Sequence, residues 1–137
     1  MELKRVVVTG LGALTPIGNT TSEFWKNLTA GQSGAAPITH FDASLFKTQF
    51  ACEVKGFNPE DHFDRKEGRK HDLYSKFAMV ASSEAVADSG INGENADLGR
   101  IGVIWGSGIG GLETFRDEVG DFIRGDGTPR FNPFFIP

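Results

Sequence analysis

The first stretch with the composition of a ligand site is VVVTGLGALTPIG, residues 6–18, where an apolar β-type run meets a glycine-rich turn. A dinucleotide-binding loop has this setting, because the glycines of G-x-G-x-x-G allow the backbone to approach a pyrophosphate. Gly10 and Gly12 supply two of the glycines, but Thr15 stands in place of the third. Pro16 occupies a position where the following helix would need a backbone donor. We therefore favour another role for these glycines, with nucleotide binding as the weaker alternative.

The sequence contains one cysteine and three histidines as candidate nucleophile, bases or metal ligands. Cys52 lies in QFACEV, an alternating run typical of a strand, so we expect a small buried cysteine and not a reactive thiolate. His40, His62 and His71 share no metal-ligand or base–nucleophile spacing, which favours surface or capping roles. We therefore predict no catalytic residue and no metal ligand among residues 1–137.

A basic run, RKEGRK at residues 65–70, stands out in a chain whose net charge is −4. Taken by itself, such a run is typical of a solvated helix start. The acidic balance argues against general nucleic-acid binding, which needs basic surfaces. No apolar run approaches the roughly 20 residues that span a bilayer, so we expect no membrane insertion. A single cysteine forms no internal disulfide and suits a reducing cytoplasm.

The elements that position these residues are predicted to alternate between strands and helices. Thr20 and Glu23 form a capping box, which predicts a helix that begins there and stops at Gly31. Two further amphipathic patterns predict helices over residues 66–89 and 112–124. The chain is therefore assigned to the α/β class.

Strands are predicted from short runs of β-branched and apolar residues. Residues 3–9 and 101–105 have the composition of buried strands, and the alternation over residues 50–55 predicts a half-buried one. Two buried strands are too few for a covered sheet, and the chain ends on the apolar segment FNPFFIP. We therefore expect the first part of a longer chain, which by itself would be aggregated or molten.

Seven motifs in a fixed order carry a family resemblance: RVVVTGLGALTPIGN, GQSG, FDASLF, RKEGRKHD, ADSGI, RIGVIWGSGIGGLE and NPFFIP. Through them the whole chain resembles the N-terminal third of the beta-ketoacyl-acyl carrier protein synthase II family, the condensing enzymes of fatty-acid elongation. The resemblance implies a thiolase-like fold with stacked α/β/α/β/α layers, of which this chain would be part of the N-terminal half. It also implies a homodimer and a decarboxylative Claisen condensation that needs no cofactor.

The resemblance implies roles for two apolar residues and places catalysis elsewhere. Ile109, between two glycines, would gate the acyl tunnel, and Phe135 would reach the acyl pocket of the other subunit. Without the resemblance, both side chains would be interpreted as core filling. The family's cysteine nucleophile and two histidines match no position here and are expected beyond Pro137.

The resemblance further implies that the basic run docks the acidic helix of acyl carrier protein through Lys66, Arg69 and Lys70. Arg130 would belong to a second basic patch, thinned because Pro129 stands where many relatives have a basic residue. A non-catalytic partner similar to a chain-length factor stays open as an alternative. A cysteine at the end of a buried strand further along the gene would decide between the two.

Overall fold

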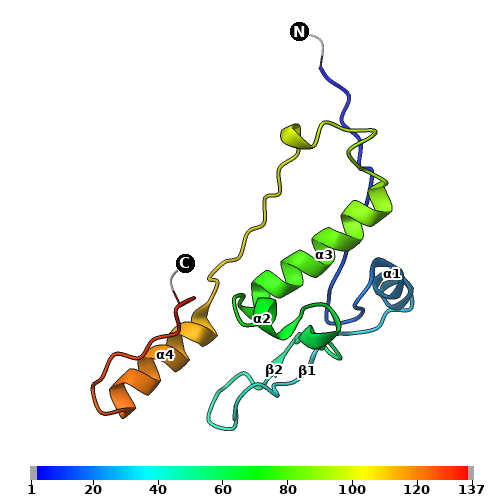
Figure 1. Cartoon of the computed structure of the whole chain (residues 1–137). Helices are drawn as coiled ribbons and strands as arrows, with labels where there is room; N and C mark the ends of the chain where they lie inside the picture. Colours follow the sequence, from blue (N-terminus) through cyan, green and yellow to red (C-terminus); the bar gives the residue numbers. More distant parts are fainter. Residues whose placement is uncertain (1–2, 136–137) are drawn as a thin grey trace. The chain divides into compact units, whose positions relative to one another are not determined.

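The computed structural model describes residues 3–135. Ile136, which belongs to the apolar C-terminal segment noted in the sequence, lies outside this range. The elements in chain order are α1 (Thr21–Thr29), β1 (Ala36–Pro37), β2 (Phe50–Ala51), the 3₁₀ turn η1 (Pro59–Asp61), α2 (Arg65–Gly68), α3 (Leu73–Ser89), η2 (Leu98–Arg100) and α4 (Leu112–Arg124) (Figure 1). They form two compact units, residues 1–58 with 79–101 and residues 59–78 with 102–137. None of the helices in the described range is long and apolar enough to cross a membrane.

Helix α1 begins where the capping box predicts. Thr20 Oγ1 accepts a hydrogen bond from the Glu23 backbone N–H at 3.2 Å. The Glu23 carboxylate accepts in return from the Asn19 N–H at 2.9 Å, one residue before the usual partner. The helix ends just before Gly31, whose φ of 70° is the left-handed conformation that glycine adopts without strain. The predicted start and stop of this helix are both confirmed.

The glycines of the opening motif lie against a helix backbone. A Cβ on Gly12 would lie 1.9 Å from the Ala81 carbonyl oxygen, and one on Gly10 would lie 2.2 Å from that of Ala85. Figure 1 shows this N-terminal segment running along α3. Thr15 and Gly18 then close a tight turn through two backbone hydrogen bonds of 2.8 and 3.2 Å, after which α1 begins. The glycines therefore allow close packing on α3, which explains their spacing without a nucleotide.

Two carboxylates of α3 satisfy backbone donors of this segment. Asp88 accepts from the Leu11 N–H at 2.8 Å. Glu84 accepts from two donors, the N–H of Ala13 through Oε2 and the N–H of Thr21 through Oε1, each at 2.8 Å. Since Thr21 is the first residue of α1, its N–H has no partner inside the helix. Glu84 thus joins α3, the glycine segment and the start of α1.

Glu84→Gln is expected to destabilise the protein by about 1–3 kcal/mol, because an amide offers one acceptor oxygen and turns an NH₂ group toward the second N–H donor. Thermal unfolding monitored by circular dichroism measures the effect. Glu94→Gln is the matched control, since Glu94 is exposed and its carboxylate accepts none of these bonds. Equal melting temperatures for the two variants would contradict the bridging role of Glu84.

The helix predicted over residues 66–89 is interrupted. Asp64 caps α2 by accepting from the N–H groups of Lys66 and Glu67, each at 2.8 Å. The short helix then ends at Gly68, a poor helix former, and α3 begins only at Leu73. Gly90, with φ of 65°, ends α3 as predicted. The prediction is therefore correct for the C-terminal end and wrong for residues 69–72.

The predicted strands are wrong or only partly formed within this chain. Residues 3–9 and 101–105 pair with no strand in the described range, and Val6 and Ile104 are 89% and 98% exposed. Among residues 3–135 the one sheet pairs β1 with β2, antiparallel, with Ala36 opposite Ala51. A strand needs a neighbour for its backbone donors and acceptors, and residues 3–135 provide only this short pair. The stacked layers are thus not built by these residues alone.

Candidate substrate and partner site

The basic run forms α2 and the turn after it. Lys66 and Arg69 are exposed, and neither forms an ion pair with any residue in the range 3–135. Lys70 is half-buried and its ammonium group donates to the Glu67 carboxylate. This hydrogen bond is the main cause that lowers the pKa of Glu67 below its usual value. Of the three predicted docking cations, Lys66 and Arg69 are therefore available to an acidic partner, and Lys70 is held by Glu67.

Ile109 lies in the glycine-rich loop before α4 and is 72% exposed. The loop ends at Gly111, the N-cap of α4, whose φ of 68° requires a glycine or a strained residue. A Cβ on Gly110 would lie 2.6 Å from Tyr74 Cζ, so the loop backbone touches the start of α3 here. The Ile109 side chain is thus exposed, while the backbone of the next residue, Gly110, packs against Tyr74.

Phe135 belongs to an aromatic cluster formed with α4. Its ring stacks on Phe131 with centroids 5.6 Å apart and lies 5.8 Å from Phe115. Phe131 in turn lies 5.5 Å from Phe122. The Asn132 N–H donates to Glu118 on α4 at 2.8 Å, which brings the segment back along the helix. Phe135 therefore contacts rings of its own chain.

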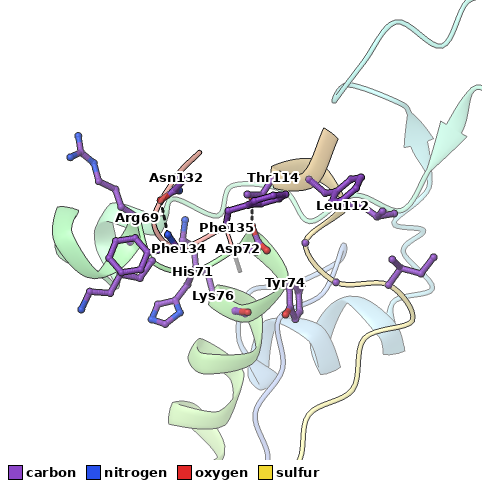
Figure 2. Close-up of a pocket in the computed structure, with 17 residues that line it drawn as sticks. Arg69, His71, Asp72, Tyr74, Lys76, Leu112, Thr114, Asn132, Phe134 and Phe135 are labelled. Atoms are coloured by element: carbon purple, nitrogen blue, oxygen red, sulfur yellow. Dashed lines mark hydrogen bonds between the residues drawn. The ribbon is translucent and has the colours of Figure 1, made fainter. Parts of the chain in front are cut away.

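Four of the six predicted site residues line one cavity of about 670 Å³ (Figure 2). These are Arg69, Lys70, Ile109 and Phe135; the walls also include His71, Asp72, Tyr74, Lys76 and Thr114. Aromatic and aliphatic walls meet several cations here, a composition suited to an apolar ligand with an acidic end or partner. Lys66 and Arg130 are not among the lining residues.

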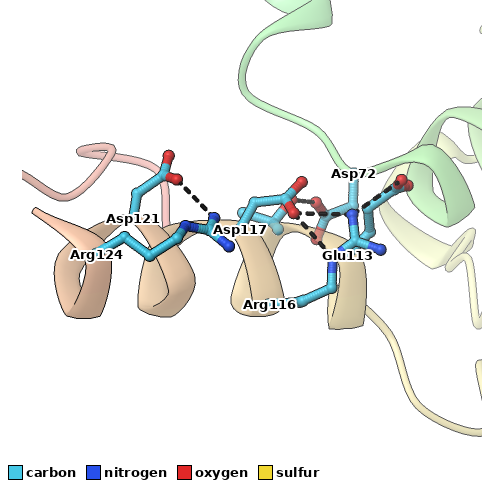
Figure 3. A network of polar contacts seen from close by, with 7 residues as sticks. Asp72, Glu113, Arg116, Asp117, Asp121 and Arg124 are labelled. Atoms are coloured by element: carbon cyan, nitrogen blue, oxygen red, sulfur yellow. Dashed lines mark hydrogen bonds and ion pairs between the residues drawn. The ribbon is translucent and has the colours of Figure 1, made fainter.

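Arg130 and the arginines of α4 are paired with acidic neighbours. Arg130 lies 3.5 Å from Asp126, and both side chains are exposed. On α4, Arg116 contacts Asp117 at 2.8 Å and Arg124 contacts Asp121 at 3.0 Å (Figure 3). Exposed pairs of this kind add little stability but neutralise the local charge. The basic run thus carries a local excess of positive charge, whereas the charge of each of these arginines is balanced by an acidic neighbour.

The structure places Cys52 and the histidines His40 and His71 at exposed or half-buried positions. Cys52 is exposed, so the expectation of a buried cysteine is wrong. Burial alternates only over residues 50–53 and in the opposite phase to the prediction, because Ala51 and Glu53 are the more buried side chains and Phe50 is 65% exposed. No three potential metal ligands cluster among the residues described. His71 approaches Glu67 at 3.8 Å at the edge of the cavity.

Sequence reasoning missed three cavity residues, Asp72, Tyr74 and Thr114. Thr114 Oγ1 donates to Asp72 Oδ1, as Figure 2 shows. Because 42 positions separate the two residues, no local spacing links them. A polar residue before a helix start was the one available signal for Asp72, and it predicts only a cap.

Comparison with known proteins identifies the family. Residues 3–133 match the family described as "Beta-ketoacyl synthase, N-terminal domain". The chain belongs to this family.

Curated relatives of similar sequence include the 3-oxoacyl-[acyl-carrier-protein] synthase 2 of Vibrio cholerae, 45% identical over 137 residues, which are 100% of this chain and 33% of the relative. That of Synechocystis sp. is 47% identical over 139 residues, with the same two coverages. The chain therefore spans about a third of the length of the curated relatives it matches.

Solved ketosynthase structures share the fold. "The ishigamide ketosynthase/chain length factor" superposes with a TM-score of 0.73 and 28% identity, over 94% of this chain and 32% of that one. A beta-ketoacyl synthase from Burkholderia phymatum gives 0.69 and 32%, over 92% of this chain and 31% of that one. The fold class is thus the thiolase-like α/β fold of ketosynthases, of which these residues form part.

Proposed function

We propose that residues 1–137 form the N-terminal part of a ketosynthase domain that elongates fatty-acyl chains. In the full-length synthase, an acyl group would condense with malonyl-acyl carrier protein, which loses carbon dioxide in a Claisen reaction. The identity of 45–47% to curated 3-oxoacyl-[acyl-carrier-protein] synthases 2 along the whole chain is the observation that carries the proposal. Incubation of the full-length protein with acyl- and malonyl-carrier protein tests it, with the β-ketoacyl product as readout.

The division of labour follows from the residues present. The cysteine nucleophile and the two histidines that the family uses have no counterpart here and belong, on this proposal, to the rest of the synthase. The exposed apolar segments 3–9 and 101–105 would be covered by that remainder. We further propose a homodimer located in the cytoplasm.

Ile109 is proposed to contact the acyl chain of its own subunit, and Phe135 to reach the acyl pocket of the other subunit across a dimer. The apolar walls around both side chains, which include Tyr74, Phe115 and Phe134, support contact with an acyl chain. An acyl chain has no polar groups along its length, so it gains free energy mainly by leaving water for such walls.

Lys66, Arg69 and Lys70 are proposed to dock the acidic acyl carrier protein. The side chains of Lys66 and Arg69 support this role, because both are exposed and form no ion pair within residues 3–135. The Lys70 ammonium group would have to leave the Glu67 carboxylate in order to bind the partner. Arg130, paired with Asp126, is proposed as a weaker contact. Exposed charges at the edge of an interface mainly change the rate at which the two proteins associate and the salt dependence of that rate.

The double variant Lys66→Glu/Arg69→Glu is expected to raise the KM for carrier-protein substrates by about tenfold at low salt, because an attractive rim becomes repulsive. Activity on free acyl-thioester analogues should stay near wild type. Steady-state kinetics with both substrate forms measure the two effects.

A matched control reverses Arg116 and Arg124, which changes the net charge equally but replaces arginines already paired on α4. It should leave the KM for carrier-protein substrates within about twofold of wild type. If the two double variants raise this KM alike, general charge and not a local docking surface is responsible. A loss of activity on the small analogues would also contradict docking.

A non-catalytic partner similar to a chain-length factor is the second candidate. The solved structure with a TM-score of 0.73 carries "ketosynthase/chain length factor" in its title, so the fold suits both roles. Condensing activity of the full-length protein alone would exclude this candidate. A full-length sequence without a cysteine at a strand-to-helix turn would favour it.

A further inference from the structure

Among the described glycines of the loop that carries Ile109, those near its end lie close to the rest of the unit and the earlier ones do not. Positions where a side chain would emerge from Gly102, Gly106 and Gly108 have no heavy atom within 4 Å. By contrast, a Cβ on Gly110 would lie 2.6 Å from Tyr74, and one on Gly111 would lie 2.7 Å from Asp72 Oδ2. The position of Ile109 therefore depends on how Gly110 and Gly111 are held.

The Asp72 carboxylate contacts this end of the loop, with one oxygen in a hydrogen bond and the other close to the backbone. Oδ1 accepts the hydroxyl hydrogen of Thr114, in the first turn of α4, while Oδ2 lies beside Gly111. Gly111 has no side chain to cap α4, so the carboxylate stands where a negative charge near a helix N-terminus is favourable. Figure 3 shows Asp72 at the end of α4 beside Glu113. One side chain thus holds both the loop end and the helix start.

Asp72 is also joined to the basic run. It follows Lys70 by two residues, and its carbonyl oxygen accepts from the Lys76 N–H at 3.0 Å in the first turn of α3. Arg69, Lys70, Asp72 and Ile109 line the same cavity. The segment 69–72, where the predicted helix is broken, therefore connects the docking cations to the loop.

We propose that Asp72 and Thr114 are positioning residues, which hold the Ile109 loop at a set place relative to the carrier-docking cations. This inference rests on the proposed function, because it assigns to the Asp72–Thr114 hydrogen bond the control of acyl-chain selection by Ile109. Neither residue contacts the reacting atoms in this role. The bond acts by restricting where the isoleucine side chain stands.

Thr114→Val in the full-length synthase removes the donor and keeps the side-chain shape. The ratio of kcat/KM for long over short acyl primers is expected to shift by about tenfold, the size of a lost hydrogen bond to a charged group. The KM for carrier protein should stay within about twofold, since the docking cations are untouched. Amide hydrogen exchange of residues 106–111 should become faster. Thr114→Ser, which keeps the hydroxyl, should retain the wild-type ratio and exchange rate.

Thr48→Val is the control for a threonine-to-valine change elsewhere, because Thr48 is exposed. If Thr114→Val alters neither the primer ratio nor the exchange of residues 106–111, the positioning role is wrong. The same conclusion holds if Thr114→Ser behaves like the valine variant. If Thr114→Val does not fold, Asp72→Ala removes the acceptor of the same bond and should shift the ratio in the same direction. A wild-type protein without condensing activity would overturn the proposed function, while hydrogen exchange would still decide whether Asp72 and Thr114 hold the loop.

Discussion

Ile109→Phe in the full-length synthase is expected to abolish most elongation of long acyl primers and to spare short ones. The larger ring adds volume to a wall of the cavity where Gly110 already lies against Tyr74. In the full-length synthase with a long acyl chain bound, the extra ring volume would overfill this site at a cost of about 1–3 kcal/mol. A factor of ten corresponds to about 1.4 kcal/mol, so kcat/KM for long primers should fall by about 5- to 150-fold. A series of primers of increasing length, each assayed at steady state, measures the effect.

Ile109→Leu is the matched control, since it conserves the side-chain volume and should leave the profile of primer lengths nearly unchanged. The thermal midpoint of Ile109→Phe should also stay close to wild type, because the side chain is 72% exposed in this chain. An equal loss of activity on short and long primers would indicate general damage to the enzyme. It would contradict the proposal that Ile109 forms part of the wall around the acyl chain.

Gly12→Ala is expected to destabilise the full-length protein by about 3 kcal/mol or more, a large effect for a single methyl group. That methyl would lie 1.9 Å from the Ala81 carbonyl oxygen and 2.7 Å from the Ala85 backbone nitrogen. Both atoms belong to the backbone of α3, so neither can move aside by a side-chain rotation. Relief requires the glycine segment to leave the helix, which would lengthen the hydrogen bonds to Glu84 and Asp88.

Gly93→Ala is the control for Gly12→Ala. A Cβ there meets its nearest heavy atom, Leu98 Cδ1, at 3.6 Å, which is ordinary van der Waals contact. Replacing this glycine should be neutral or slightly stabilising, because alanine lowers the entropy of the unfolded chain. Urea unfolding of both variants measures the difference. A Gly12→Ala protein as stable as Gly93→Ala would contradict the close packing of residues 10–12 on α3.

The sequence by itself determined the elements whose signals lie within a few residues of each other. The bonds of the capping box at Thr20 and Glu23, and the left-handed glycines at positions 31 and 90, depend on neighbours along the chain. The apolar spacing of residues 112–124 predicted α4 with its observed ends. Local hydrogen bonds and backbone preferences decide such features, so no knowledge of the fold was needed.

Tertiary structure decided the features that join distant segments. Apolar content predicted strands at residues 3–9 and 101–105, but a strand forms only where another strand supplies backbone partners. The sequence argued against a phosphate loop at the motif glycines, but only the structure shows their contact with α3. Asp72 and Thr114 lie 42 positions apart and meet only because α4 lies beside the start of α3. The spacing of residues along the chain does not predict such contacts, because they arise from packing between elements that are distant in sequence.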